Sequence, residues 1–205
     1  MLKIKAMKAN ALIVFEGLDQ SGKKTQCNLL AEKLERKGYR VKMLSFPDYE
    51  TPIGKEIKAF LNGKRVYNAY VTQILYAANR WEKKEIIEEW LNKKGILIVD
   101  RYSQSNLAYG IAKGLSLKWL INLEKGLPKP NLVILIDISP ITSFKRKLKS
   151  RDVYEKNLDF LKKVREAYIS LSKKFGWKII NGERSIMDVS KDVWNIVKDY
   201  IGLIA

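Results

Sequence analysis

Two glycines and a lysine follow an apolar stretch near the start of the chain, at a spacing typical of phosphate binding. Residues 11–15 are apolar and include β-branched side chains, which predicts a buried parallel strand. Gly17 and the pair Gly22-Lys23 come next, and apolar residues at helical spacing from Cys27 onward predict a helix that starts near Gly22. In this setting backbone N–H groups and a helix N-terminus can hold phosphate, and Lys23 can reach the β- and γ-phosphates. The stretch therefore predicts a nucleotide phosphate loop, with an ordinary glycine-rich turn as the alternative.

The position after the lysine departs from the usual phosphate-loop pattern. That pattern has Ser or Thr there, because the hydroxyl binds Mg²⁺. In this chain the residue is Lys24, and Thr25 lies about 100° further round the helix. Thr25 cannot simply take over the role, so we expect Mg²⁺ to be held mainly by nucleotide phosphates, water and Asp100.

Two further pairs of side chains have types and spacings suited to a nucleotide. Asp100 and Arg101 directly follow an apolar stretch, where the carboxylate could hold Mg²⁺ and the guanidinium could bind phosphate. A structural ion pair is the alternative for them. Tyr76 precedes Arg80 by four residues, so both share a helix face that suits a stacked nucleobase and a bound phosphate. A core aromatic beside a surface arginine is the alternative there.

A basic segment lies between two predicted helices. Its positive residues are Lys145, Arg146, Lys147, Lys149 and Arg151. A solvated helix surface is the ordinary explanation of such a run. The functional alternative is a lid that brings positive charge onto a transferring phosphate and excludes water.

The composition excludes several kinds of site. The chain has no histidine and one cysteine, Cys27, which rules out a histidine base, a histidine-bound metal and an internal disulfide. It carries 39 Lys and Arg against 22 Asp and Glu, a balance that suits non-specific nucleic-acid binding or attraction of small polyphosphates. The lysines are spread over almost every segment, and the basic residues form no patch interleaved with aromatic residues, so we expect no nucleic-acid partner. We expect no membrane partner either, since the chain has no apolar run of membrane-spanning length. No apolar run approaches about 18 residues, and the N-terminus lacks signal-peptide features, so we expect a cytoplasmic location.

The elements that must position these residues alternate along one predicted domain, residues 1–205. Strands are predicted near residues 11–16, 40–46, 96–100, 132–136 and 177–180. Helices are predicted near residues 22–37, 51–61, 67–91, 103–112, 116–124, 158–175 and 186–200, and Pro140 suits the first turn of another. This alternation predicts a parallel sheet with helices on both faces, whose ligands bind beyond the carboxyl ends of the strands. Four loops would then form one crevice there: residues 17–23, Phe46-Pro47, residues 100–102 and Asp137.

With these motifs together, the chain resembles the thymidylate kinases, P-loop enzymes that move the γ-phosphate of ATP onto dTMP. The resemblance extends from Phe15 to about Val193. The phosphate loop alone indicates only a nucleotide phosphotransferase, whereas Asn79-Arg80-Trp81-Glu82 together with Asp100-Arg101-Tyr102 is specific to this family. The other matching motifs are residues 15–19 with Gly22-Lys23 and Thr25-Gln26, Phe46-Pro47, Ser105, residues 126–130 and Tyr154-Glu155.

The resemblance implies a fold and a set of ligands. The fold is α/β, a three-layer P-loop kinase with a five-stranded parallel sheet, helices on both faces and a short basic lid at about residues 145–156. ATP and Mg²⁺ are the implied cofactors and dTMP the acceptor. A homodimer and a cis peptide bond between Phe46 and Pro47 are also implied.

The resemblance also implies roles for single residues. Tyr76 would stack on thymine, Arg80 would bond the base edge, and Arg101 would bind the dTMP phosphate. Asp19 would contact the 3′-hydroxyl and the reacting phosphates, while Tyr109 would crowd the 2′ position. The implied ATP site comprises Gly17, Leu18, Asp19, Gln20, Ser21, Gly22, Lys23, Lys24, Thr25 and Arg146, with Arg146 over adenine. The implied dTMP site comprises Asp19, Phe46, Tyr49, Tyr76, Arg80, Arg101, Ser105, Tyr109 and Tyr154. The implied catalytic residues are Lys23, Asp19, Arg101, Arg151 and Lys149, and Asp100 would serve Mg²⁺.

Three departures from the family pattern bear on these roles. Lys24 replaces the hydroxyl, and Gln20 stands where some members have a loop arginine, so the missing charge must come from the lid. Tyr49 stands where a related member has an arginine near the acceptor phosphate. An acceptor other than dTMP, such as dUMP, is the alternative activity, and a basic nucleic-acid-binding P-loop protein is the alternative outside catalysis.

Overall fold

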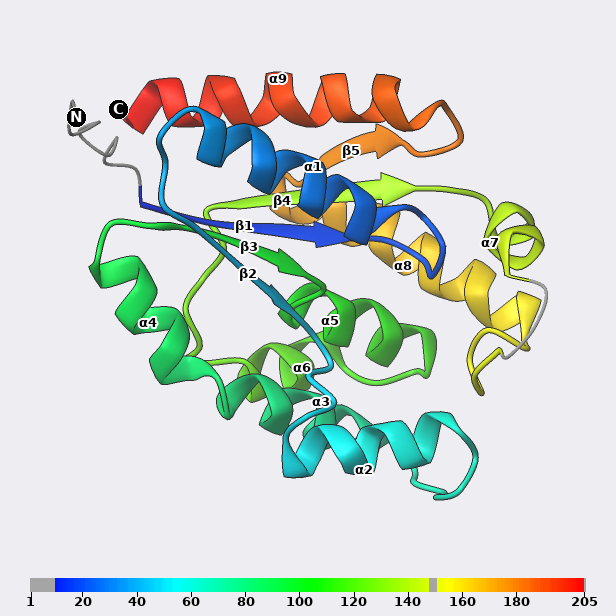
Figure 1. Cartoon of the computed structure of the whole chain (residues 1–205). Helices are drawn as coiled ribbons and strands as arrows, with labels where there is room; N and C mark the ends of the chain where they lie inside the picture. Colours follow the sequence, from blue (N-terminus) through cyan, green and yellow to red (C-terminus); the bar gives the residue numbers. More distant parts are fainter. Residues whose placement is uncertain (1–9, 148–150, 205) are drawn as a thin grey trace.

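A five-stranded parallel sheet forms the centre of the molecule (Figure 1). The computed structural model describes residues 10–147 and 151–204. The strands are β1 (Ala11–Glu16), β2 (Val41–Ser45), β3 (Ile96–Asp100), β4 (Leu132–Asp137) and β5 (Lys178–Asn181). Their order across the sheet is β2-β3-β1-β4-β5, and every neighbouring pair runs parallel. The predicted parallel sheet is confirmed.

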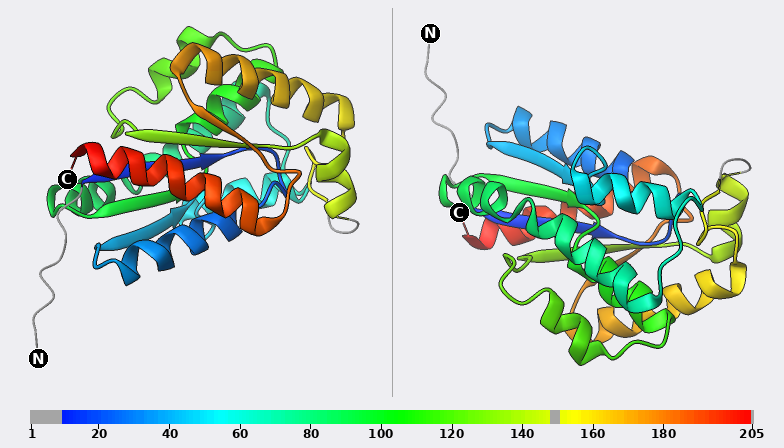
Figure 2. Two further views of the ribbon diagram at one scale, coloured as in Figure 1. Left: turned by 90° about the horizontal axis from the view of Figure 1, so that it is seen from above. Right: turned by 90° about the horizontal axis from the view of Figure 1, so that it is seen from below.

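Helices cover both faces of this sheet (Figures 1 and 2). They are α1 (Lys23–Arg36), α2 (Pro52–Leu61), α3 (Ala69–Trp81), α4 (Lys84–Asn92), α5 (Ser103–Ala112), α6 (Leu117–Leu123), α7 (Pro140–Arg146), α8 (Leu158–Phe175) and α9 (Ile186–Ile204). One face packs against α1 and α9, and the opposite face packs against α4, α5 and α8. The predicted three-layer arrangement is therefore confirmed.

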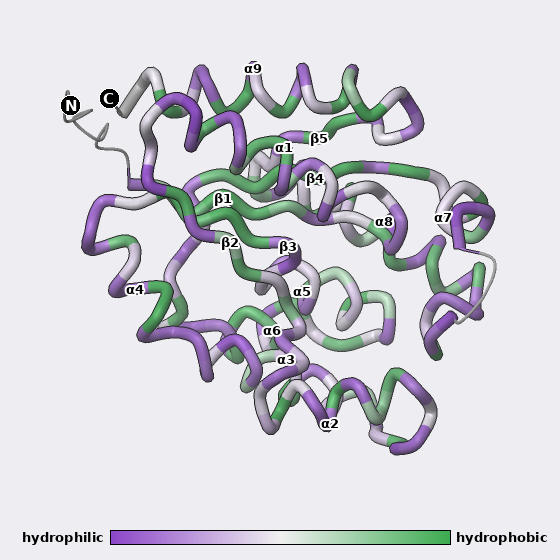
Figure 3. Tube along the Cα trace, in the orientation of Figure 1, coloured by the Kyte–Doolittle hydropathy of each residue, from purple (hydrophilic) through white to green (hydrophobic). Residues whose placement is uncertain are grey.

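The central strand β1 is buried on both faces. Ile13 and Phe15 pack in the cluster with α1 and α9, whereas Leu12 and Val14 pack in the cluster under α4. All six residues of the strand are buried, which explains why its sequence is a continuous apolar run rather than an alternating one. The strands accordingly form the hydrophobic centre of the trace, with hydrophilic segments outside (Figure 3).

The single helix predicted over residues 67–91 is wrong, because the chain breaks into α3 and α4. The two helices turn their apolar faces to different neighbours: α3 packs on α2 and α5, whereas α4 packs on β3. Polar side chains mark the break. The amide of Asn79 donates to Glu82, and Lys83 pairs with Asp48 at 2.8 Å, which ties the junction to the loop after β2.

Two residues that were predicted to mark the starts of helices do so in the structure. Thr51 caps α2 by accepting a hydrogen bond from the N–H of Gly54 at 3.0 Å, and Pro140 occupies the first turn of α7. The Phe46–Pro47 peptide bond is cis, as expected. Over the described ranges, 10–147 and 151–204, no helix has the length and apolar character needed to span a membrane.

Candidate active site

The loop between β1 and α1 has the backbone that a phosphate loop requires. Gly17 has φ +142°, and a Cβ at this position would lie 2.4 Å from the carbonyl oxygen of Ile136, so only glycine fits. Gly22 has φ +95°, and α1 begins directly after it without a side-chain cap. The N–H groups of the first helical turn are therefore left for a ligand.

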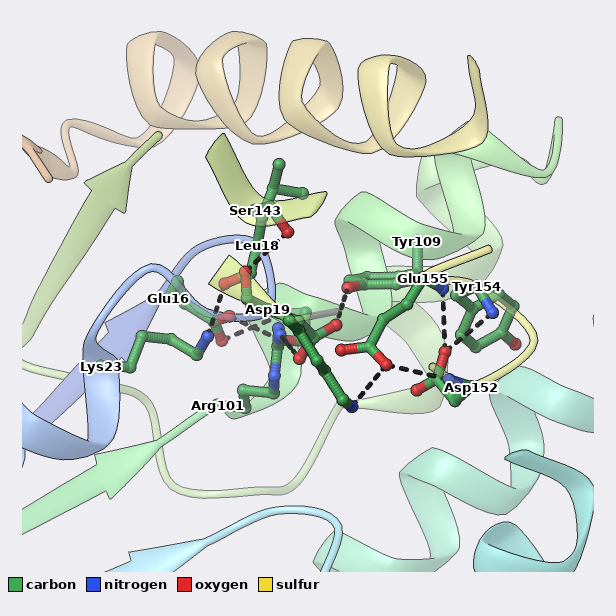
Figure 4. A network of polar contacts seen from close by, with 12 residues as sticks. Glu16, Leu18, Asp19, Lys23, Arg101, Tyr109, Ser143, Asp152, Tyr154 and Glu155 are labelled. Atoms are coloured by element: carbon green, nitrogen blue, oxygen red, sulfur yellow. Dashed lines mark hydrogen bonds and ion pairs between the residues drawn. The ribbon is translucent and has the colours of Figure 1, made fainter. Parts of the chain in front are cut away.

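Lys23 is held inside this loop. Its ammonium is buried and donates to the carbonyl oxygen of Leu18 at 2.8 Å (Figure 4). Burial lowers the pKa of Lys23, and the nearby charge of Arg101 lowers it further, against the opposing effect of Asp100. A phosphate would add negative charge beside the ammonium and favour its charged form.

A hollow lies beside the phosphate loop at the carboxyl ends of the strands. It is lined by Asp19, Gln20, Gly22, Lys23, Lys24, Thr25, Ser45, Phe46, Pro47, Tyr49, Asp100 and Arg101. Lys24 and Thr25 are exposed at its edge. Three loops that are distant in the sequence thus meet at the carboxyl ends of the strands, where ligands of parallel sheets bind.

Asp19 and Arg101 point toward one another at the centre of the crevice (Figure 4). Arg101 Nη2 donates to Asp19 Oδ1 at 2.7 Å, and the hydroxyl of Tyr109 lies 3.4 Å from Asp19 Oδ2. Burial alone would raise the pKa of Asp19, but the charges of Arg101 and Lys23 lower it to about 2. Asp19 is therefore an ionised acceptor throughout the neutral range.

Glu16, the last residue of β1, holds the start of α5 and the hydroxyl of Tyr168 beside Arg101. The sequence analysis assigned it no role. Its buried carboxylate accepts from the N–H groups of Tyr102 and Ser105 at 2.8 and 3.1 Å, and from the hydroxyls of Ser105 and Tyr168 at 2.6 and 2.8 Å. Burial raises the pKa of Glu16, while Arg101 and these hydrogen bonds oppose the rise. The available signal was an acidic residue ending an otherwise apolar strand.

The backbone after β3 is also unusual. Arg101 has φ +65°, a left-handed conformation that is uncommon for a residue with a side chain, and its N–H donates to the carbonyl of Phe15 at 2.9 Å. Its guanidinium also donates to Ser105 Oγ and to the hydroxyl of Tyr168, at 3.2 and 3.3 Å. The turn fixes the guanidinium at the edge of the sheet, where sequence-based reasoning expected it.

A second hollow adjoins the first, and six of its fifteen lining residues are aromatic. It is lined by Asp19, Phe46, Pro47, Tyr49, Leu61, Gln73, Tyr76, Arg80, Arg101, Tyr102, Ser105, Asn106, Tyr109, Asp152 and Tyr154. Burial raises the pKa of Tyr49 to about 12 and that of Tyr76 well above its usual value, so both rings present neutral faces. The hollow contains all nine residues that the resemblance assigns to the acceptor.

Arg80 reaches this second hollow from α3 but is not a free cation. Its guanidinium forms a buried two-point pair with Glu124, in which Nε donates to Oε2 at 3.0 Å and Nη2 to Oε1. Within the part of the chain that the structure describes, its Nη1 makes no hydrogen bond. Sequence reasoning had not identified Glu124, which fixes the guanidinium plane.

The basic segment after α7 divides into differently placed cations. Arg146 donates to the carbonyls of Gln20 and Gly182, both at 3.1 Å, and so lies beside the phosphate loop. Arg151 donates to the carbonyl of Phe144 at 2.7 Å, with its guanidinium 3.3 Å from the centre of that ring. Lys149 lies outside the described residues.

Lys147, which the sequence analysis placed in the basic segment without assigning it a catalytic role, is close to the crevice. Its ammonium pairs with the buried carboxylate of Glu155 at 2.6 Å, and its charge contributes to lowering the pKa of Asp19. The side chain is 32% exposed, so it remains open to a ligand.

Two carboxylates at strand ends differ in their surroundings. Asp100 lines the phosphate-side hollow, and its Oδ1 is buried with no hydrogen-bond partner among the described residues. Such an oxygen suits a cation ligand. Asp137 was expected in the same crevice, and this is wrong. Its carboxylate instead binds Arg165 of α8 through two contacts of 2.7 Å, and it lines neither hollow.

Comparisons with known proteins agree with this geometry. A family model described as thymidylate kinase matches residues 15–193. The chain is 41% identical to a thymidylate kinase of Arabidopsis thaliana, over 93% of this chain and 72% of that protein. It is 38% identical to one of Dictyostelium discoideum, over 93% of this chain and 86% of that protein. A solved structure of thymidylate kinase from Candida albicans matches with a TM-score of 0.84 and 31% identity, and the match covers 95% of this chain and 94% of that one.

Proposed function

The chain belongs to the thymidylate kinase family, and we propose that its two hollows bind ATP and dTMP and bring their phosphates together. The chain is accordingly an ATP-dependent kinase that converts dTMP to dTDP. The observation that carries the assignment is that the two hollows share Asp19 and Arg101. A phosphoryl group held in one hollow can therefore pass to an acceptor held in the other.

The phosphate-loop side is proposed to bind ATP. The backbone N–H groups of residues 17–22 would surround the β- and γ-phosphates, and Lys23 would leave the carbonyl of Leu18 for a phosphate oxygen. Arg146, which lies between Gln20 and Gly182, would cover the adenine. Ser21 supports this assignment, because its buried hydroxyl has no partner in the described part of the chain.

The aromatic side is proposed to bind dTMP. Tyr76 would stack on thymine, and Arg80 would offer Nη1 to the base edge while Glu124 holds its other nitrogens. Tyr109 would sit against the 2′ position of the sugar, with Tyr154 beside it at a ring separation of 5.5 Å. Phe46, Tyr49 and Ser105 complete the walls.

The chemistry is proposed to be direct in-line transfer. The dTMP phosphate is already ionised near neutral pH, so no general base is needed, and positioning and charge neutralisation supply the rate. Arg101 would bind the acceptor phosphate, and Asp19 would fix that guanidinium and the sugar 3′-hydroxyl. Because Gln20 carries no charge, a cation of the basic segment, Lys147, Lys149 or Arg151, would neutralise the transferring group.

Mg²⁺ is proposed as the metal that accompanies ATP. The unpartnered, buried Oδ1 of Asp100 fits this role. Bound there, the metal would neutralise phosphate charge.

A homodimer is proposed through α3 and α6. Tyr70, Val71 and Ile74 of α3 are 55%, 37% and 46% exposed, and Ile121 of α6 is 42% exposed. The rings of Tyr70 and Trp119 of α6 also pack with their centres 5.0 Å apart, which joins the two helices at this point. Exposed apolar surfaces of this kind mark interfaces. Sedimentation as a monomer would contradict the proposal.

The acceptor prediction tests the proposed function directly. Since Tyr76, Arg80 and Tyr109 favour a stacked pyrimidine on deoxyribose, we expect dTMP to be phosphorylated faster than dCMP, dGMP or UMP. ADP release in a coupled assay, with and without each monophosphate, measures this. Equal or faster turnover of any of those three would overturn the assignment, and equal turnover of dUMP would indicate a broader acceptor range.

A second prediction concerns the departure at Lys24. A protonated lysine cannot bind Mg²⁺, whereas a serine hydroxyl at the same position can. We expect Lys24→Ser to lower the Mg²⁺ concentration needed for half-maximal rate, and also to raise the KM for ATP if the ammonium contacts a phosphate. Lys33→Ser, on the exposed surface of the same helix, is the matched control. Unchanged Mg²⁺ dependence in Lys24→Ser would mean that the departure has no mechanistic consequence.

A further inference from the structure

Gln73 places a buried amide without partners in the wall of the acceptor hollow. The residue is 0% exposed, and neither Oε1 nor Nε2 makes a hydrogen bond within the described ranges. A buried amide without a partner is costly, so such a group is normally satisfied by water or by a ligand. Because Gln73 lines the hollow beside Tyr76 and Arg80, a bound ligand is the natural partner.

The neighbours of Gln73 show which kind of ligand atom it can reach. Asn106 Nδ2 donates to the backbone carbonyl of Gln73 at 3.3 Å and to Glu124 Oε1 at 2.6 Å. Glu124 in turn holds Arg80. Asn106 therefore links the surroundings of Gln73 to those of Arg80, and its own Oδ1 is buried without a partner in the described part of the chain.

Three groups without a hydrogen-bond partner among the described residues thus line the same hollow. Arg80 Nη1 is a donor, Asn106 Oδ1 is an acceptor, and the Gln73 amide can act as a donor through Nε2. The pairing edge of a pyrimidine-2,4-dione presents the complementary groups: two carbonyls, which can accept from the two donors, and an N3–H between them, which can donate to the acceptor. Cytosine would place an acceptor at N3 opposite the Asn106 oxygen and would leave it unsatisfied.

We propose that Gln73 is a specificity residue that donates Nε2–H to one of the two base carbonyls, while Arg80 takes the other. The inference rests on the proposed function, since it assigns dTMP to this hollow. It adds to that function a specific contact, because the base edge would then form hydrogen bonds with Arg80, Asn106 and Gln73. The pattern does not distinguish thymine from uracil, so the reading by Gln73 applies equally to dTMP and dUMP.

The test combines variants of Gln73 with analogues of dTMP in which one base carbonyl oxygen is replaced by sulfur. Sulfur is a weaker acceptor, so we expect the wild-type enzyme to lose about tenfold in kcat/KM with 2-thio-dTMP or 4-thio-dTMP. Gln73→Met should raise the KM for dTMP about tenfold with little change in kcat, and should abolish the discrimination against one of the two analogues. The analogue against which Gln73→Met no longer discriminates identifies the base carbonyl that Gln73 contacts.

Controls separate a specific contact from general damage. Gln104→Met removes another buried glutamine with an unpartnered Oε1, but that side chain does not line the hollow, so discrimination should stay at the wild-type level. If Gln73→Met folds poorly, Gln73→Leu also removes the donor with a smaller, uncharged side chain, and should show the same loss. Full wild-type discrimination against both analogues in a folded Gln73 variant would overturn the inference. Failure of the wild-type enzyme to phosphorylate dTMP would instead overturn the proposed function.

Discussion

Replacement of Lys23 by methionine is expected to lower kcat for dTMP phosphorylation by about 10³-fold. The ammonium is the one cation buried inside the described part of the phosphate loop, and it is held 2.8 Å from the carbonyl of Leu18, a contact that a phosphate oxygen can replace. Its charge would act where negative charge moves from the γ-phosphate toward the β-phosphate. Methionine keeps the apolar stem but supplies no charge, so the KM for ATP should rise as well.

The same variant should not lose stability. Burial lowers the pKa of Lys23, which means that the folded protein disfavours the charged form relative to the unfolded chain. At pH values below the folded-state pKa of Lys23, its buried charge lowers the free energy of unfolding. The Lys23→Met variant therefore loses this destabilising contribution, and it also loses one hydrogen bond to the carbonyl of Leu18. We expect a melting temperature at or above that of the wild type, a separation of function from stability that is common at active sites.

Steady-state kinetics and thermal unfolding of Lys23→Met measure both expectations. Lys33→Met is the matched control, because Lys33 lies exposed on the same helix near Trp194 and touches neither hollow. A Lys23→Met enzyme with wild-type kcat would contradict the assigned role. A large drop in melting temperature would instead show that the ammonium is needed for the fold.

Much of this architecture was predictable because its signals are local. Continuous apolar runs such as residues 11–15 and 96–99 mark strands covered on both faces, and strand alternation with helices then requires a parallel sheet. The rule that ligands bind at the carboxyl ends of such strands placed Lys23 and Arg101 in one crevice before any contact was known.

What could not be predicted depends on pairs of side chains that are distant in the sequence. Glu16 and Tyr168 are 152 positions apart, and Arg80 and Glu124 are 44 apart, so no local pattern connects them. Asp137 shows the opposite error. Its position at the end of a strand suggested that it would line the crevice. In the structure its carboxylate instead forms an ion pair with Arg165 of α8.

The sequence also could not show which cation of the basic segment lies closest to the reacting phosphates. Sequence reasoning favoured Arg151 and Lys149, since the family resemblance places the missing charge in the lid. In the structure, the guanidinium of Arg151 is engaged by Phe144, whereas the charge of Lys147 acts on Asp19. Spacing within a run of cations cannot reveal which member faces the site, because that depends on where the helix α7 ends.

Lys147→Ala is therefore expected to lower kcat by about 10²-fold, with little change in the KM for dTMP, because its charge would be needed mainly in the transition state. We expect Arg151→Ala to have the smaller effect of the two, and Lys163→Ala, which removes an exposed lysine from α8, to leave kcat unchanged. Lys149→Ala completes the series, since its role remains a prediction from the sequence alone.

The partner of Lys147 provides the decisive control. Removing the lysine leaves the buried carboxylate of Glu155 with one remaining contact among the described residues, the N–H of Asp152 at 2.9 Å. An unpaired buried charge could disturb the site by itself. Glu155→Gln removes that charge. If Lys147 acts on the transferring phosphate, Lys147→Ala with Glu155→Gln should stay as slow as Lys147→Ala alone. Recovery of kcat in the double variant would show that Lys147 only balances Glu155, and a wild-type kcat in Lys147→Ala beside a slow Arg151→Ala or Lys149→Ala would return the catalytic role to those residues.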